Sequence, residues 1–371
     1  MRIEQGLLLI PVGVDIVAFM RNGGKAPAED VPIERTELTL GHLRDRRLAT
    51  HGNGSLEKSS LDGIRLHFKH LVGTLGERYP IRKLSLADLQ RHVDRRAKAK
   101  GIHGRLSPAT IKKEIVTLRT TWNWGVRMGF VTGRFPNAGL RYPKEDEKPP
   151  FMTWREIERR VKAGGLTDKD QAVLWDALFL TLPEIGELLA HVKASARQPW
   201  VYPLFVFAAH TGARRSEMIR THVADVDLEG GTVLIREKKR ARGQRTTRRV
   251  PLSPHLAAAL REWLEVHPGG QTLFSQATGV TRSKTKRSTA SAVTRDEAHD
   301  HFKRTLAGSK WKVIRGWHVL RHSFASNCAA SGVDQRLIDS WLGHTTEIRK
   351  RYLHLIPSNE STALRSVFGE E

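Results

Sequence analysis

The sequence predicts a mainly α-helical protein with a small β-sheet, divided into two domains. Apolar residues recur at helical spacing in its first half, and a strand-like stretch follows a glycine turn in its second half. A proline-rich, charged linker at residues 134–150 separates the two halves. With 371 residues, 39% of them hydrophobic, the chain is long enough to build two packed cores. We therefore expect an N-terminal segment at 1–50, a helical domain at 51–147 and an α+β domain at 148–371.

Three amphipathic helices are predicted in the helical domain. The first is capped by Ser59 or Ser60, the second by Ser85 with Asp88 completing a capping box, and the third begins at Ser107-Pro108. Their apolar positions are Leu61, Ile64, Phe68 and Leu71, then Leu86, Leu89 and Val93, then Ile111, Ile115, Leu118 and Trp122. Residues 1–50 show little periodicity and are expected to be irregular chain of unknown role.

The second domain is expected to begin with a helix, because Thr153 to Glu156 forms a capping box. Residues 201–209 form an apolar run that predicts a buried element. Gly230-Gly231 predicts a turn, and the residues at 232–235 that follow it predict a strand. Residues 236–249 hold eight Lys or Arg in fourteen positions, and we expect them to form a basic hairpin.

The composition indicates a polyanionic partner. The chain carries 62 Lys and Arg against 39 Asp and Glu, a formal net charge of +23. This excess disfavours an enzyme of small metabolites, and favours nucleic acid or, less often, an acidic membrane surface. The apolar stretch from Leu7 to Met20 is too short to cross a bilayer. Cys328 is the single cysteine, which excludes an internal disulfide and a Cys-rich zinc site and favours a reducing, cytoplasmic location.

Four motifs in the second domain combine residue types that suit chemistry on a phosphate. They are Thr211 to Glu217, the basic hairpin, Trp317 to His322, and Leu342 to His344 followed by Arg351-Tyr352. Arginine guanidiniums form planar forks that match phosphate oxygens, and histidines donate hydrogen bonds or move protons. A lysine can protonate a leaving oxygen, and a tyrosine hydroxyl becomes a nucleophile once its proton is removed.

The spacing within these motifs supports grouping them. His318 and Arg321 are three residues apart, so on a helix they lie on one face. Gly343 suits the end of the preceding helix, and His344 follows it directly. His318 and His322 have the spacing of a zinc-binding helix, but the glutamate of that motif is missing, so we predict no metal site.

In order and spacing, from Ala209 to Leu355, these motifs resemble those of tyrosine recombinases of the phage integrase family. Residues 55–145 resemble, more loosely, the helical core-binding (SAM-like) domain of that family, and the second domain resembles its catalytic domain. The resemblance implies catalytic roles for Arg214, Lys239, His318, Arg321, His344 and Tyr352, with Lys238 as the alternative catalytic lysine.

The resemblance also implies a reaction and its partners. Tyr352 attacks a DNA phosphodiester to form a 3′-phosphotyrosyl intermediate, and strand exchange proceeds through a Holliday junction without metal, ATP or another cofactor. The substrate is double-stranded DNA with specific recombination sites, in the nucleoid. The chain acts as a homotetramer in the synaptic complex, is monomeric or weakly associated when free, and in some systems needs accessory DNA-bending proteins.

Two alternatives to a site-specific recombinase remain, and the first follows from a departure in the last motif. The interval from His344 to Tyr352 is eight positions, one fewer than the family commonly has. A DNA-binding relative impaired in catalysis is therefore one alternative. A transposase-like or topoisomerase-like tyrosine DNA breaker is the other.

Basic residues outside the motifs are assigned to the DNA backbone. They lie on the third helix opposite its apolar stripe, in the hairpin, and in a Ser-, Thr-, Lys- and Arg-rich loop at 278–294. The residues are Lys112, Lys113, Arg119, Arg240, Arg242, Arg245, Lys284, Lys286 and Arg287. For the helix, the alternative is a solvated basic face.

Overall fold

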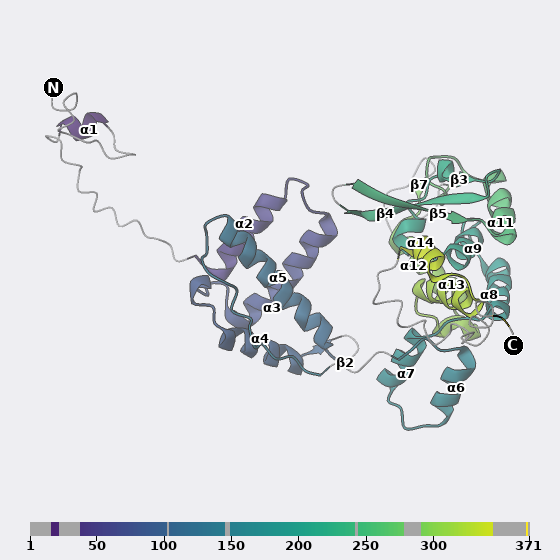
Figure 1. Ribbon diagram of the computed structural model, residues 1–371, viewed down its shortest axis with the longest axis horizontal. Coiled ribbons are helices and arrows are strands. Elements are labelled where there is room, and N and C mark those ends of the chain that lie inside the picture. The colour runs from purple at the N-terminus through teal and green to yellow at the C-terminus, as the bar shows by residue number, and fades with distance from the viewer. Residues whose placement is uncertain are drawn as a thin grey trace. The chain divides into compact units, whose positions relative to one another are not determined.

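The computed structural model describes residues 16–21, 38–101, 104–144, 149–241, 244–277, 291–343 and 369 (Figure 1). In the hairpin, residues 238–241 and 244–246 are described by their backbone alone. The chain divides into two compact units, Met1–Asp146 and Glu147–Glu371, and each is described by itself.

The first unit is a group of helices around its own hydrophobic core. Its main helices are α2 (Leu40–His51), α3 (Lys58–Leu75), α4 (Leu86–Lys98) and α5 (Pro108–Arg127). Helix α5 packs against the other three, and the four apolar residues predicted to form its stripe are all buried (Figure 1). The smaller elements are α1 (Ile16–Arg21), the 3-10 turn η1 (Ile81–Lys83), and the paired strands β1 (Lys100–Gly101) and β2 (Gly104–Arg105).

Local capping signals predict the helix starts of this unit correctly in two of three places. Ser85 and Asp88 form the predicted capping box of α4, and Ser107 caps α5. The prediction of a serine cap for α3 is wrong, because the helix begins at Lys58 with no side-chain cap. Leu86 is exposed on the first turn of α4, so the buried face of that helix is narrower than predicted.

Helix α2 is not predicted by the sequence. Leu40 and Leu43 are fully buried in the core of the first unit, and Thr39 caps the helix by accepting a hydrogen bond from the His42 N–H. The expectation of irregular chain up to residue 50 is therefore wrong for α2, and also for α1. Its basic residues are many and its apolar residues few, so this helix has no regular stripe.

The second unit contains one antiparallel sheet of three strands in the order β3-β4-β5. Its strands are β3 (Val226–Asp227), β4 (Thr232–Ala241) and β5 (Gln244–Pro251), so the predicted basic hairpin is present. Val233 pairs with Val250 and Ile235 with Arg248, but the register shifts between Arg236 and Arg240. A second, short pair of strands is β6 (Ser275–Gln276) and β7 (Ser291–Ala292).

Helices surround α9 (Val201–Thr211), which is the buried apolar run seen in the sequence. It packs against α8 (Leu182–Ser195), α11 (Pro254–Glu265), α12 (Arg295–Leu306) and α13 (His318–Ala330) (Figure 1). A helix enclosed on this many sides is apolar all round rather than amphipathic, which explains its continuous hydrophobic sequence. The remaining helices are α6 (Trp154–Lys162), α7 (Asp168–Asp176), α10 (Arg215–Met218) and α14 (Gln335–Leu342), with the 3-10 turns η2 (Val223–Asp225) and η3 (Lys310–Val313).

The predicted fold class is confirmed: the protein is mainly helical, with small antiparallel sheets, in two units. The capping box at Thr153 and Glu156 opens α6 as predicted. Among the helices in the described ranges, none is both long and apolar enough to cross a membrane.

Candidate active site

The motif from Thr211 to Glu217 begins where α9 ends. The Thr211 hydroxyl donates a hydrogen bond to the Phe207 carbonyl and accepts one from the Ala213 N–H, which closes the last turn. Gly212 has a left-handed backbone (φ 59°), and a Cβ there would overlap the Leu342 side chain. Glycine is therefore needed for both the turn and the close approach of α14.

Arg214 follows this turn and directly precedes α10. The Glu217 carboxylate accepts hydrogen bonds from the Arg214 backbone N–H at 2.8 Å and from its guanidinium at 2.7 Å. The same guanidinium donates to the Gly343 carbonyl at 3.4 Å and lies 4.0 Å from the Glu237 carboxylate. The Arg214 side chain is 36% exposed, so a ligand can reach it from solvent.

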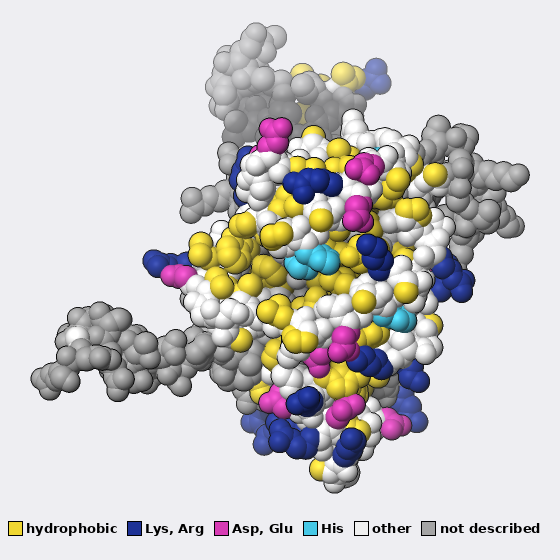
Figure 2. All heavy atoms as spheres, turned by 90° about the vertical axis from the view of Figure 1, so that its right-hand side faces the viewer, with side chains coloured by type: hydrophobic (Ala, Val, Ile, Leu, Met, Phe, Trp, Pro, Cys, Tyr) yellow, Lys and Arg dark blue, Asp and Glu magenta, His cyan; other side chains and the backbone are white. Residues whose placement is uncertain are grey.

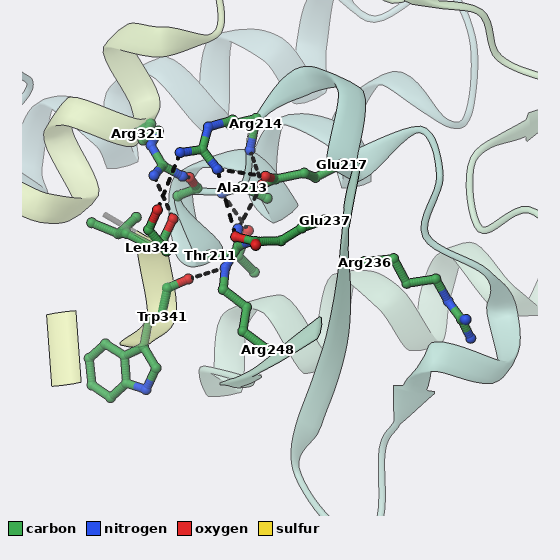
Figure 3. Close-up of polar contacts among 12 residues, drawn as sticks. Thr211, Ala213, Arg214, Glu217, Arg236, Glu237, Arg248, Arg321, Trp341 and Leu342 are labelled. Atoms are coloured by element: carbon green, nitrogen blue, oxygen red, sulfur yellow. Dashed lines mark hydrogen bonds and ion pairs between the residues drawn. The ribbon is translucent and has the colours of Figure 1, made fainter. Parts of the chain in front are cut away.

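Arg321 approaches the same place from α13. It is only 4% exposed, and its guanidinium donates to the Gly212 carbonyl at 2.7 Å and to the Leu342 carbonyl at 2.6 Å. Because Leu342 and Gly343 are consecutive, Arg214 and Arg321 converge on neighbouring peptide carbonyls at the end of α14 (Figure 3). Two residues far apart in sequence thus place two guanidiniums at Leu342 and Gly343, the residues that precede His344 in the chain.

Glu217 lies between two arginines and is almost completely buried. Arg214 approaches it at 2.7 Å and Arg248, from β5, at 2.6 Å (Figure 3). Burial alone would raise the pKa of the Glu217 carboxyl, but the hydrogen bonds and charges of Arg248 and Arg214 outweigh it and hold the pKa at about 2. The carboxylate is therefore ionised at neutral pH and keeps both arginines in place.

The three guanidinium nitrogens of Arg248 donate hydrogen bonds to three different elements, α14, β4 and α10. It donates to the Trp341 carbonyl at 2.5 Å, to Glu217 at 2.6 Å and to Glu237 at 3.1 Å. Its side chain is 6% exposed. Arg236, on the strand paired with β5, points away from this cluster and binds Asp225 instead (Figure 3).

Gly343 ends α14 with a left-handed backbone (φ 60°), as the sequence predicts for that position. A Cβ at this residue would overlap the Glu237 carboxylate. Gly343 therefore lies directly against the Glu237 carboxylate, and a larger residue would force the turn or the carboxylate to move.

His318 begins α13 and is exposed, whereas Arg321 one turn later is buried. The pKa of His318 is lowered, first by partial desolvation and then by the positive charges of Arg321 and Arg214. The imidazole is therefore neutral at pH 7 in the protein alone. His322, on the next turn, packs against Phe151 with ring centroids 4.2 Å apart.

The structure describes the predicted site only in part. Arg214, His318 and Arg321 are brought together, but His344 and Tyr352 lie outside the described residues. The backbone of Lys238 and Lys239 is in β4, within the stretch where the register shifts, and their side chains lie outside the description.

The predicted DNA-binding residues divide in the same way. Lys112, Lys113 and Arg119 are exposed on α5, opposite its buried stripe. Those whose side chains or whole residues lie outside the description are Arg240, Arg242, Arg245, Lys284, Lys286 and Arg287.

The burial of Arg248 is missed by sequence reasoning, although a signal for it is present. Arg248 is one of the basic residues of the hairpin, yet Val250 two positions later is buried on the same face of β5. Strand residues alternate between faces, so this spacing places Arg248 toward the core with Val233 and Ile235 of β4.

A pocket of about 300 Å³ lies beside these residues, and its lining is mainly apolar. Figure 2 looks onto a face of the second unit on which hydrophobic side chains gather near the centre, with charged side chains around them. The pocket is lined by Leu182, Ile185, Ala209, His210, Val250, Pro251, Leu252, Ser253, Phe324, Asn327, Cys328 and Trp341.

Within the described part of the chain, no group of three His, Cys, Asp or Glu residues is placed to hold a metal ion.

Comparison with known proteins identifies relatives over most of the chain. Residues 179–358 match the model of the phage integrase family. The tyrosine recombinase XerA of Thermococcus kodakarensis is 30% identical over 277 residues, which cover 71% of this chain and 93% of that protein. The tyrosine recombinase XerC of Xanthomonas campestris pv. campestris is 26% identical over 339 residues, covering 89% of this chain and 86% of that protein.

The fold has solved counterparts. The structure of a lambda integrase tetramer bound to a Holliday junction aligns with a TM-score of 0.56 at 14% identity. The alignment covers 93% of this chain and 85% of that one.

Proposed function

This chain belongs to the tyrosine recombinase family of DNA strand-exchanging enzymes, and on that basis we propose that Tyr352 cuts and rejoins DNA at specific sites. The Tyr352 oxygen attacks a backbone phosphorus, a bond from tyrosine to the 3′-phosphate forms, and the bond to the 5′-oxygen breaks. Lys239, or Lys238 in its place, gives a proton to the departing 5′-oxygen. The 5′-hydroxyl of a partner strand then reverses the step, so no ATP is consumed.

The observation that carries this proposal is the convergence of Arg214 and Arg321 at the end of α14. A phosphate bound there gains charge as it passes to the transition state, and fixed guanidiniums stabilise that charge without reorganising. Arg214 is the exposed partner and binds the phosphate oxygens, whereas Arg321 holds the ends of α9 and α14 around it. His344, which follows Gly343, adds a hydrogen-bond donor.

His318 takes part in proton transfer. Its lowered pKa keeps it neutral at pH 7, so it can accept the proton of the tyrosine hydroxyl as the nucleophile attacks. The negative charge of a bound phosphate counters the arginine charges that lower this pKa. The same imidazole can then donate a hydrogen bond to a phosphate oxygen.

Both units contact the DNA duplex in this proposal. The exposed basic face of α5 and the basic residues of the hairpin other than Arg236 and Arg248 bind the backbone, which accounts for part of the net charge of +23. A relative of this fold was solved as a tetramer on a Holliday junction, and we propose the same assembly here, formed on DNA from monomeric or weakly associated chains in the nucleoid. Accessory DNA-bending proteins assist it where the recombination site needs bending.

A duplex with a nick beside the cleavage point tests the proposal. Cleavage releases a short fragment that carries the 5′-hydroxyl, and because this fragment diffuses away, the strand cannot be rejoined and the covalent adduct accumulates. We expect the wild-type protein to form an adduct that survives denaturing electrophoresis and Tyr352→Phe to form none. Tyr202→Phe is the matched control, since its hydroxyl contacts His255 at 3.2 Å in another part of the unit.

Two outcomes would contradict the proposal. Sequence-specific DNA binding by the wild-type protein without any adduct would favour a relative impaired in catalysis. Relaxation of supercoils without strand exchange between two duplexes would favour a topoisomerase-like enzyme.

A further inference from the structure

The reaction above does not use Arg248, although this buried residue binds Glu217, Glu237 and the Trp341 carbonyl around the site. Its charge cannot be solvated at 6% exposure, so burial is tolerable only because two carboxylates and a carbonyl receive its hydrogen bonds. These three acceptors come from α10, β4 and α14. A fork that joins three elements fixes their relative positions.

Each acceptor of Arg248 lies next to a group proposed to act on DNA. Glu217 also holds the guanidinium of Arg214 at 2.7 Å. The carbonyl of Trp341 lies in the last turn of α14, three residues before His344.

The third acceptor, Glu237, directly precedes the two candidate lysines. The strand register shifts between Arg236 and Arg240, so the β4–β5 ladder alone does not fix the position of this stretch. The bond from Arg248 to Glu237, at 3.1 Å, supplies a constraint that the ladder lacks.

We propose that Arg248 is a positioning residue that holds Arg214, the lysine-bearing stretch of β4 and the turn before His344 in fixed relative positions. This inference rests on the proposed function. The phosphate site is then assembled before DNA binds, and no binding energy is used to gather its parts. A lysine could keep the positive charge beside Glu217, but it is a single flexible point charge and cannot reproduce the rigid fork.

Two substitutions separate positioning from folding. Arg248→Lys keeps a cation beside the buried Glu217, and Arg248→Met removes it. The matched controls are Arg261→Lys and Arg261→Met, because Arg261 is exposed on α11 of the same unit. For each variant we would measure the melting temperature, the affinity for a recombination-site duplex and the single-turnover rate of adduct formation on the nicked duplex at saturating DNA.

We expect Arg248→Lys to stay folded, to bind DNA within about threefold of wild type and to form the adduct about 10- to 100-fold more slowly, as small displacements in an active site do. Arg248→Met is expected to be slower still. Both Arg261 variants are expected to react at the wild-type rate.

A substrate with sulfur in place of the bridging 5′-oxygen tests whether Arg248 positions the lysine-bearing stretch through its hydrogen bond to Glu237. A thiolate leaves with little help from a general acid, since the pKa of a thiol is about 8.5. We therefore expect sulfur to recover part of the loss in Arg248→Lys, with the remainder caused by displaced Arg214. Absence of any recovery would overturn the assignment of Arg248 to the lysine-bearing stretch.

A folded Arg248→Lys protein that reacts within about twofold of wild type would overturn the inference as a whole. Arg248→Lys alone therefore tests the positioning role of Arg248, even if Arg248→Met does not fold. Wild-type protein without an adduct on the same substrate would instead contradict the proposed function, so the two failures are distinguishable.

Discussion

Each unit of this molecule contains a buried glutamate held by basic residues, and the two clusters differ in where their arginines lead. In the first unit, Glu114 on α5 accepts hydrogen bonds from Arg96 at 2.6 Å and His92 at 3.0 Å, and it lies 2.8 Å from His70. Arg96 also contacts His70, so its guanidinium ends inside the cluster. This group ties α3, α4 and α5 together.

In the second unit, Glu217 is equally buried but its arginines extend further. Arg248 reaches β4 and α14, and Arg214 reaches the end of α14 while remaining 36% exposed, against 14% for Arg96. The buried carboxylate of the first unit thus holds an arginine that is enclosed, whereas that of the second unit holds one that reaches solvent and that we propose acts on DNA.

The largest expected effect comes from removing Arg321, which binds the end of α14 beside Arg214 of the second cluster. Arg321→Ala is expected to slow adduct formation by about 10³-fold or more, because the ends of α9 and α14 lose their common donor. DNA affinity should change little, since Arg321 is buried and other residues contact the backbone. Single-turnover cleavage and a binding titration check this, with exposed Arg304→Ala on α12 as control. Normal cleavage by Arg321→Ala would remove this arginine from the site.

The next effect concerns a property that both clusters share, the lowered pKa of the buried glutamate. Burial would raise the pKa of both carboxyls, but hydrogen bonds from His92 and Arg96 to Glu114, and from Arg248 to Glu217, lower each from 4.5 to about 2. A lowered folded-state pKa stabilises the fold above the unfolded value, and this contribution is lost as pH falls from about 4.5 toward 2. Each carboxylate should account for about 3 kcal/mol of that loss.

Acid denaturation of Glu114→Gln and Glu217→Gln checks this contribution. Each variant should be less stable than wild type at pH 7 and should lose less stability between pH 5 and pH 2. A variant whose stability falls as steeply as that of wild type over this range would show that the substituted carboxyl does not contribute.

A smaller effect is expected at the turn that the second cluster holds. Gly343→Ala would place a methyl group against Glu237 in a left-handed backbone, which forces either the turn or the carboxylate to move. We expect adduct formation to slow by about 10- to 100-fold with DNA affinity retained. Gly332→Ala is the control, because Gly332 also has a positive φ but nothing lies within 4 Å of its Cβ position. Equal cleavage rates for the two variants would show that the contact with Glu237 is unimportant.

The smallest effect concerns the outer surface of the first unit. Replacing Lys112, Lys113 and Arg119 by alanine should weaken DNA binding without changing the cleavage rate at saturating DNA. The slope of log affinity against log salt should fall by about 0.9 for each phosphate that the variant no longer neutralises. The control replaces Lys193, Lys310 and Arg315, each of which already has a carboxylate partner. An unchanged slope in the first triple variant would indicate a merely solvated face.

Local rules predict much of the fold. The capping boxes at Ser85 and Thr153, the stripe of α5 and the glycine stop at Gly343 each depend on residues within a few positions of one another. Helix α2 escapes these rules because its burial is decided by contacts with α3 and α5, not by a stripe of its own.

The site could be predicted only as far as its motifs. Residue type and spacing identify Arg214 and Arg321, but their meeting point is a pair of backbone carbonyls that no sequence pattern encodes. The burial of Arg248 is hard to predict, because a basic residue in a basic hairpin suggests DNA contact. Arg248 is buried because it lies on the same face of β5 as Val250 and because α14 packs against that face.

We propose that the Glu114 cluster stabilises the fold whereas the Glu217 cluster positions a catalytic arginine, and a paired substitution tests this difference most directly. Arg214→Met and Arg96→Met are each measured for the free energy of unfolding and for single-turnover adduct formation at saturating DNA. We predict that Arg214→Met slows adduct formation by about 10³-fold and leaves most of the stability, because Arg248 still pairs with Glu217. Arg96→Met should lower the free energy of unfolding by about 3 kcal/mol or more, yet the folded variant should react within about threefold of wild type. Wild-type cleavage by Arg214→Met, or loss of cleavage in folded Arg96→Met, would contradict the account.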